Sequence, residues 1–296
     1  MKRYILLIIA TLSIIACYSQ ATVEWNYFMS STFRNHDKED CGKGDFQRVK
    51  ARVNVPLSVK LDRWGNPLVW NVTLSATHGW LGNEGLAREL NPNRIINANV
   101  SVSHIRNLSE NWMLIASLGV GIYAPTDYVS FRSVLANGGA IFAYKLTDNL
   151  SVGLGAGLTN SYGAPMVVPM GYLDWRLHGR VEVLLNISNG IQTKVSIKAT
   201  DHLSVDLSPI EFDGMSAVIK RDGKDKLYSM FMIRSTASLN LDLGKGISIF
   251  GGAGGVLLRN STIKDRKIGS LFGGSDENKY RFNTTPQFLA GIRYKF

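Results

Sequence analysis

The strongest constraint on the fold is the alternation of residue types between Phe288 and Phe296. Every second residue there is apolar or aromatic, and Arg293 and Lys295 lie between them. Because successive side chains of a β-strand point to opposite faces, the pattern predicts a strand with one apolar and one largely polar face. The apolar face would carry Phe288, Ala290, Ile292, Tyr294 and Phe296.

Similar alternating runs recur along the chain, separated by segments rich in turn-forming residues. In residues 49–59 the apolar odd positions alternate with polar even positions that include Lys50 and Arg52. Beyond the first twenty residues no apolar run approaches the ~18 residues of a transmembrane helix, and mean hydropathy is near zero. Runs of about ten alternating residues are typical of membrane barrels. The sequence therefore predicts an all-β, transmembrane antiparallel β-barrel.

The connections between these runs divide into short and long ones in alternation. This order predicts short periplasmic turns and longer extracellular loops, with both chain ends in the periplasm. Counting gives 14 strands if residues 22–33 form the first. The alternative is 12 strands, if that segment is an arm and residues 180–199 form one long strand. The predicted long segments are residues 34–45, 81–93, 125–133, 161–165, 213–225 and 260–279.

The aromatic residues close to the final Phe296 carry a family resemblance. This segment resembles the C-terminal recognition strand of Gram-negative outer-membrane β-barrels, and the chain from residue 20 resembles uncharacterised outer-membrane barrels of Bacteroidota. The resemblance implies the cell outer membrane as location, and outer-membrane lipids and the barrel-assembly machinery as partners. It implies no activity and leaves the oligomeric state open. The assembly signal that it implies comprises Phe288, Ile292, Tyr294 and Phe296.

The pattern of the N-terminal residues is typical of a secretory targeting segment. Lys2 and Arg3 precede an apolar stretch that is too short to span a bilayer as a helix. We expect residues 1–19 to be a signal peptide cleaved before Gln20, which leaves residues 20–296 as the barrel domain. The residues before Cys17 also satisfy a lipoprotein-type box, so a lipidated Cys17 is the alternative.

The distribution of charge and the cysteine content argue against a nucleic-acid-binding protein and a disulfide-stabilised fold. Removing Lys2 and Arg3 from the 33 basic residues leaves 31 against 23 acidic residues, a net charge of +8. No basic run with interleaved aromatic residues accompanies this excess, so nucleic-acid binding is not expected. After cleavage before Gln20 only Cys41 remains, which excludes an internal disulfide.

The glycine-rich segments and the histidines, which could suggest phosphate or metal binding, have structural explanations. The glycine-rich residues 153–157 and 251–255 lie within predicted strands, where no helix follows to bind a phosphate. The five histidines form no pair at metal-ligand spacing. The sequence therefore predicts no metal site, cofactor or catalytic residue, and no enzyme.

A membrane-embedded lipid or lipopolysaccharide hydrolase is nevertheless the alternative from a different class. Ser75 with His78, or Ser103 with His104, would be the nearest serine and histidine pairs in sequence. Residues one or three apart on a strand point to opposite faces, so neither pair forms a dyad by itself. Only pairs between different strands leave this alternative open.

The polar face of the predicted strands is rich in basic residues. We expect ten of them to face the interior against Asp174, Glu182 and Asp206, which suggests passive passage of small solutes with a preference for anions. The alternative is that carboxylates from loops, such as Glu84, Glu89, Asp213 and Asp222, neutralise them and close a structural or partner-binding barrel. The candidate lumen charges are Lys50, Arg52, Lys194, Lys198, Arg234 and Arg293, with Lys60, Lys145, Arg176 and Lys295 also inward.

Overall fold

The computed structural model describes residues 19–160, 166–176, 181–186, 192–265 and 280–296. Residues 1–18, with nearly all of the predicted signal peptide, lie outside them, as do the predicted loop 161–165 and the short connection 188–190. The strands are β1 (Gln20–Arg34), β2 (Asp40–Leu61), β3 (Pro67–Gly85), β4 (Arg94–Asn107), β5 (Trp112–Pro125), β6 (Val134–Thr147), β7 (Leu150–Thr159), β8 (Met166–Arg176), β9 (Val181–Asn186), β10 (Gln192–Lys198), β11 (Leu203–Arg221), β12 (Lys224–Gly244), β13 (Ile247–Asp265), β14 (Tyr280–Phe282) and β15 (Thr285–Lys295).

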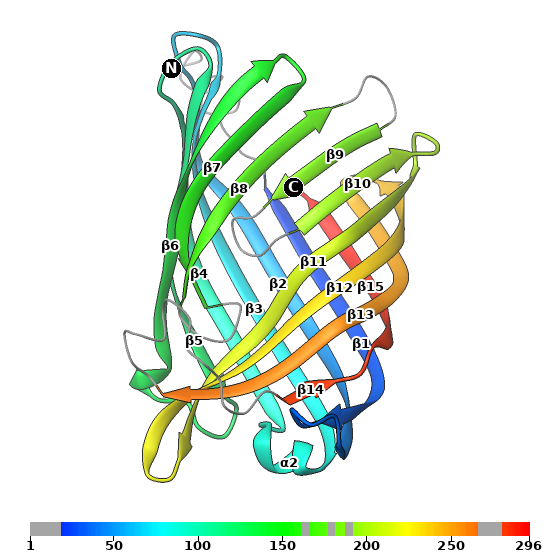
Figure 1. Cartoon of the computed structure of the whole chain (residues 1–296). Helices are drawn as coiled ribbons and strands as arrows, with labels where there is room; N and C mark the ends of the chain where they lie inside the picture. The colour runs from blue at the N-terminus through cyan, green and yellow to red at the C-terminus, as the bar shows by residue number, and fades with distance from the viewer. Residues whose placement is uncertain (1–18, 161–165, 177–180, 187–191, 266–279) are drawn as a thin grey trace.

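The strands form one closed antiparallel barrel (Figure 1). From β1 to β14 each strand pairs with the next along the chain, and β1 closes the ring against β15. Because β14 and β15 both lie between β13 and β1, they are two pieces of one interrupted strand. The described residues thus form 14 strand positions, as predicted. The 12-strand alternative is wrong, since β1 pairs with β2 from Gln20 onward and β9 and β10 are separate paired strands.

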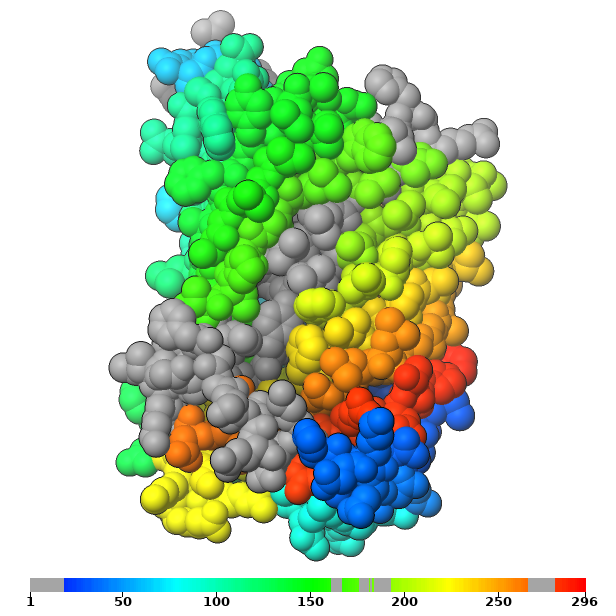
Figure 2. All heavy atoms as spheres, in the orientation of Figure 1, coloured from blue at the N-terminus to red at the C-terminus, as the bar shows by residue number. Residues whose placement is uncertain are grey.

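The outer face of the barrel is apolar. Leu118 on β5 is 73% exposed and Leu154 on β7 is 78% exposed, with further exposed leucine, valine and tryptophan side chains around the ring. In the space-filling view the side chains of β10 to β13 form a continuous slanted outer surface (Figure 2). On β15 the predicted apolar face is exposed at Phe288, Ile292 and Tyr294. The exterior therefore matches a lipid environment.

The two ends of the barrel differ. Gln20 pairs with Lys295, so β1 begins where β15 ends, and we name this the terminal end. The opposite end, the loop end, carries the short helix α2 (Leu86–Leu90), the 3₁₀ turn η1 (Phe131–Ser133) and the turn between β11 and β12 (Figure 1). Among the described residues no helix is long and apolar enough to cross a membrane.

Residues 213–225, predicted as a long loop, form the tip of a strand hairpin. β11 continues to Arg221 and β12 starts at Lys224. Asp222 and Gly223 form the turn with φ values of 53° and 73°, as a tight two-residue hairpin turn requires. The prediction failed because residues 215–218 of this stretch are all buried, so the sequence there lacks the alternation of a lipid-facing strand. Other predicted loops are also shorter, since β2 begins at Asp40 and β3 runs to Gly85.

The hairpin tip turns into the barrel. Glu211 is the last residue of β11 that pairs with a described residue of β10, and beyond it the strand edge meets the inner side of β4, where Asn97 Nδ2 donates to Ser216 O at 2.9 Å. One face of the hairpin packs through Val218 and Leu227 against β5 and β6. We name residues 212–231 the inturned hairpin. Its other face joins a buried core of Phe28, Phe46, Leu81, Ile95, Met215, Ala217, Tyr228, Met230, Met232 and Val256.

Candidate functional site

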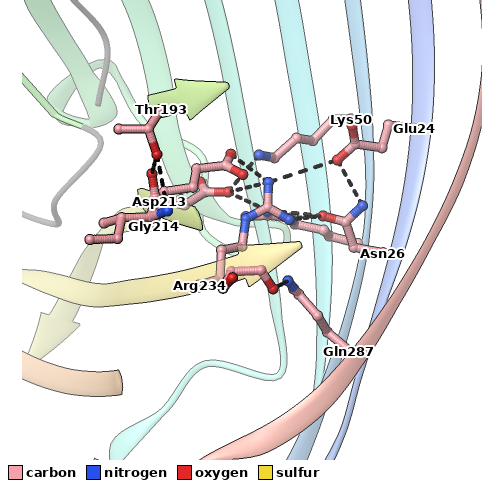
Figure 3. Close-up of polar contacts among 12 residues, drawn as sticks. Glu24, Asn26, Lys50, Thr193, Asp213, Gly214, Arg234 and Gln287 are labelled. Atoms are coloured by element: carbon pink, nitrogen blue, oxygen red, sulfur yellow. Dashed lines mark hydrogen bonds and ion pairs between the residues drawn. The ribbon is translucent and has the colours of Figure 1, made fainter. Parts of the chain in front are cut away.

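A layer of charged side chains crosses the barrel interior beside this buried core (Figure 3). Four strands contribute to it because the inner face changes there from apolar to polar residues. Cross-strand partners place Glu24 opposite Lys50, Asn26 opposite Arg48, and Glu211 opposite Arg234. We name this set the charge layer: Glu24 and Asn26 from β1, Arg48 and Lys50 from β2, Glu211 and Asp213 from β11, and Arg234 from β12.

Asp213 is the central acceptor of the charge layer. Its Oδ2 accepts hydrogen bonds from Arg48 Nη2 and from Lys50 Nζ, the latter at 2.7 Å, and lies 3.2 Å from Arg234 Nη2. Arg234 Nη2 also donates to Glu211 Oε1 at 2.5 Å. Hydrogen bonds to charged groups are stronger than neutral ones, so this carboxylate ties β2 to both strands of the inturned hairpin.

The rest of the layer balances its charge. Asn26 Oδ1 accepts from Arg48 Nη2 at 3.0 Å and from Arg234 Nη1 at 2.9 Å. Glu24 Oε1 accepts from Asn26 Nδ2 at 2.8 Å and lies 4.0 Å from Arg234 Nη2. With Lys50, Glu211 and Asp213 included, three basic groups face three carboxylates. The layer is therefore neutral, which buried charges require if they are to be tolerated away from water.

Exposure changes steeply across the charge layer. The side chain of Arg48 is fully buried and that of Arg234 is 4% exposed, whereas Lys50 is 29% exposed. On the buried side Arg48 lies over two aromatic rings, with its guanidinium carbon 5.3 Å from the Phe28 centroid and 5.9 Å from the Phe46 centroid. The layer thus separates a filled half of the barrel, toward the loop end, from an accessible half.

The accessible half has a polar inner face. Arg52 and Lys198 are exposed, and Lys194 Nζ lies 2.7 Å from Asp206 Oδ2. Ser196 Oγ donates to Asp206 Oδ1 at 2.6 Å. We name the inner face from the charge layer to the terminal end the vestibule. Small hydroxyl and amide side chains alternate with charges there, which suits a water-filled space.

The structure divides the sequence-predicted lumen charges into paired and unpaired groups. Lys50 and Arg234 lie in the charge layer and Lys194 pairs with Asp206, whereas Arg52, Lys198 and Arg293 form no ion pair with another described residue. Lys145 pairs with Asp148 of the adjacent turn. The side chains of Arg176 and Glu182 lie outside those that the structure describes.

The neutralising carboxylates come from strands, which corrects the expectation that loops supply them. Glu84 lies 3.3 Å from Lys43 in an exposed pair, and the exposed Asp222 lies 3.7 Å from the half-buried Lys226 at the hairpin turn. Glu89 is also exposed. Asp213 does neutralise lumen cations, but from β11.

Lys60 was predicted to face inward, and this prediction is wrong. An irregularity between Pro56 and Ser58 shifts the register of β2 against β3, so Ser58 pairs with Trp70 and Lys60 with Leu68. Cross-strand partners share a face, and Trp70 is 44% exposed on the outside. One extra residue therefore transfers Lys60 to the outer face at the terminal end.

The serine and histidine pairs considered for hydrolysis lie on opposite faces. Ser75 is the partner of Arg52 on the inner face. His78 stacks on Trp80 with ring centroids 4.2 Å apart, on the outer face of the same strand. His104 likewise stacks on Trp70 at 4.0 Å, while Ser103 faces inward. Neither sequence-adjacent pair forms a nucleophile and base.

A closed antiparallel barrel with an apolar exterior and a polar interior is a transmembrane β-barrel of the outer-membrane type. The chain belongs to the family described as "Domain of unknown function (DUF6268)", whose model matches residues 15–295.

Solved structures with a similar course of the chain are outer-membrane proteins. The COG4313 outer membrane channel from Pseudomonas putida F1 is 12% identical, with 94% of this chain and 95% of that chain covered and a TM-score of 0.46. A Pseudomonas aeruginosa FadL homologue is 12% identical, covering 94% and 90%, with a TM-score of 0.42. Comparison with curated proteins finds no significant relative. The fold assignment rests on the strand pairing of the chain itself.

Proposed function

We propose that this protein is an outer-membrane channel for small polar solutes, closed in the present conformation by the inturned hairpin. The observation that carries the proposal is the contrast between the two halves of one lumen. The vestibule is polar and accessible, whereas the half toward the loop end is filled by side chains of the barrel strands themselves. A barrel whose role was structural alone would not need an accessible polar interior.

The inturned hairpin supports the proposal as the element that would move. Beyond Glu211, β11 pairs with no described strand other than β12, so its free edge is held by side-chain contacts rather than by a second ladder of hydrogen bonds. At the tip, Asp225 accepts a hydrogen bond from Arg132 of η1. On its other side the hairpin is continuous with the barrel, since β12 pairs with β13 from Lys226 onward, so β11, β12 and this part of β13 would move together.

Truncation of the hairpin tests the proposal. Met215 and Met230 are cross-strand partners, so replacing residues 216–229 with Asn-Gly would join them by a two-residue turn. The hairpin would then end at Met215, inside the barrel. We expect this variant to conduct ions in planar bilayers more strongly than the parent, because it removes Ala217, Val218, Leu227 and Tyr228 from the packing that fills the loop half. Single-channel conductance is the measurement.

The matched control, Asp222→Asn, gives the native turn the same Asn-Gly sequence, because residue 223 is already glycine. It keeps the hairpin length and should keep the barrel closed. Heat-modifiable mobility in detergent gels establishes that both variants are folded. A folded truncated barrel that passes no more current than the control would contradict passage and favour a structural or partner-binding role.

The membrane orientation follows as part of the proposal, with the terminal end in the periplasm and Phe288, Ile292, Tyr294 and Phe296 as the assembly signal. We expect Phe296→Asp to reduce membrane insertion strongly, since it places a charge on the lipid-facing side of β15. Lys295→Gln, on the inner face, should insert as the parent does. Outer-membrane recovery after fractionation is the measurement, and equal recovery of both variants would count against the signal.

A further inference from the structure

A row of polar side chains crosses the vestibule wall near the terminal end. Thr22 on β1 pairs with Arg52 on β2 and with Arg293 on β15, and Arg293 pairs in turn with Ser248 on β13. These residues share the inner face because Lys50 and Glu24, two positions away on β2 and β1, face inward in the charge layer. We name Arg52, Thr22 and Arg293 the basic row.

The distance between the strands of Arg52 and Arg293 is short enough for both side chains to contact one ligand. Neighbouring strands lie about 4.8 Å apart, so one intervening strand separates their Cα atoms by about 10 Å. In the structure the guanidinium carbon of Arg293 lies 5.4 Å from the centroid of the Phe250 ring. An arginine side chain is long enough to reach the space above Thr22 from either neighbouring strand. In the next row toward the terminal end, Gln20 pairs with Lys295 and Asn54, which adds another basic group on the same face.

Among the described residues no carboxylate lies within ion-pair distance of the basic-row arginines, although Glu24 attracts Arg52 from one row deeper. Glu24, one row deeper, is already engaged with Asn26 and Arg234. Asp242 lies two strands beyond Arg293, across Ser248, and its Oδ1 accepts from Gly244 N at 2.8 Å. Arg293 Nε is buried without a hydrogen-bond partner.

We propose that the basic row binds the oxyanion of a small solute, a carboxylate or phosphate group that enters the vestibule from the terminal end. The charge layer neutralises its own cations, so the basic row is the uncompensated positive charge of the β2–β1–β15 wall. Two guanidinium groups present forked donors that match carboxylate and phosphate oxygens, and the Thr22 hydroxyl adds a third donor. This deepens the proposed function, because it names the chemistry of the solute that the barrel would admit.

Binding can be measured without any current. Isothermal titration of the purified barrel in detergent at low salt would use two probes separately, inorganic phosphate and succinate. We expect Arg52→Gln and Arg293→Gln each to weaken binding about tenfold or more, as loss of a hydrogen bond to a charged group does. Added sodium chloride should weaken binding of the parent through screening. Lys43→Gln, which removes an exposed pair at the loop end, is the control and should bind as the parent does.

The two probes distinguish the sources of the oxyanion: binding of phosphate alone indicates a phosphorylated solute, and binding of succinate alone a carboxylate. Arg52 is exposed, so its variant should fold, and it decides the result if Arg293→Gln does not fold. The proposal is overturned if neither probe binds the parent, or if Arg52→Gln binds as tightly as Lys43→Gln. A barrel that binds a probe yet never conducts would refute passage and leave the site standing.

Discussion

Asp213→Asn should destabilise the folded barrel by about 3–5 kcal/mol, because it leaves buried cations without the carboxylate that they share. Arg48, Lys50 and Arg234 all contact this group, and the first and last are almost fully buried. Without it, three basic groups would face only Glu24 and Glu211. Urea unfolding of the barrel in lipid vesicles, followed by tryptophan fluorescence, would measure the loss.

Two further variants test whether the loss of stability comes from the charge imbalance in the layer or from losing any carboxylate. Glu84→Gln breaks the exposed pair with Lys43, and exposed pairs contribute at most about 1 kcal/mol, so its midpoint should stay close to that of the parent. The double variant Asp213→Asn with Lys50→Gln restores equal numbers of opposite charges in the layer and should recover part of the lost stability. If Asp213→Asn and Glu84→Gln lose the same amount, the charge layer does not hold the hairpin.

The alternation of side chains was enough to predict the barrel, because a lipid-facing strand needs apolar residues at every second position. The C-terminal strand illustrates this, with Phe288 and Ile292 exposed and Leu289 buried. The same reasoning failed where both faces of a strand are buried. In β11 the consecutive residues Met215 to Val218 are all buried, so the period of two disappears and the hairpin tip resembled a loop.

The charge layer was predictable only in part, since its members depend on register. The inward orientation of Lys50 and Arg234 followed from the alternation of residues along their strands. That of Glu24 could have been found in the same way, because Glu24 lies between the outward Val23 and Trp25. Glu211 could not, since a register shift between Ser208 and Glu211 precedes it. Which carboxylate meets which cation across the lumen depends on how far the hairpin turns inward, and no local pattern encodes that distance.

Leu118→Arg should cost about 2–4 kcal/mol although the side chain is 73% exposed, because the exposure is to lipid. Leu118 lies near the middle of β5 on the outer face, where an arginine would have to leave water for hydrocarbon. On the exterior of a water-soluble barrel the same substitution would change stability by no more than about 0.5 kcal/mol. Urea unfolding in vesicles again gives the difference.

The matched control for this prediction is the same substitution at a leucine that lies closer to the membrane border. Leu243 is 56% exposed and lies at the terminal end of β12, next to the turn that leads to β13. The cost of a cation on the outer face falls to about 0–1 kcal/mol near the membrane border, so Leu243→Arg should be tolerated. Because both variants make the same chemical change on exposed leucines, their difference isolates the depth of the surrounding hydrocarbon. Equal stability of the two variants would mean that β5 does not cross a bilayer at Leu118.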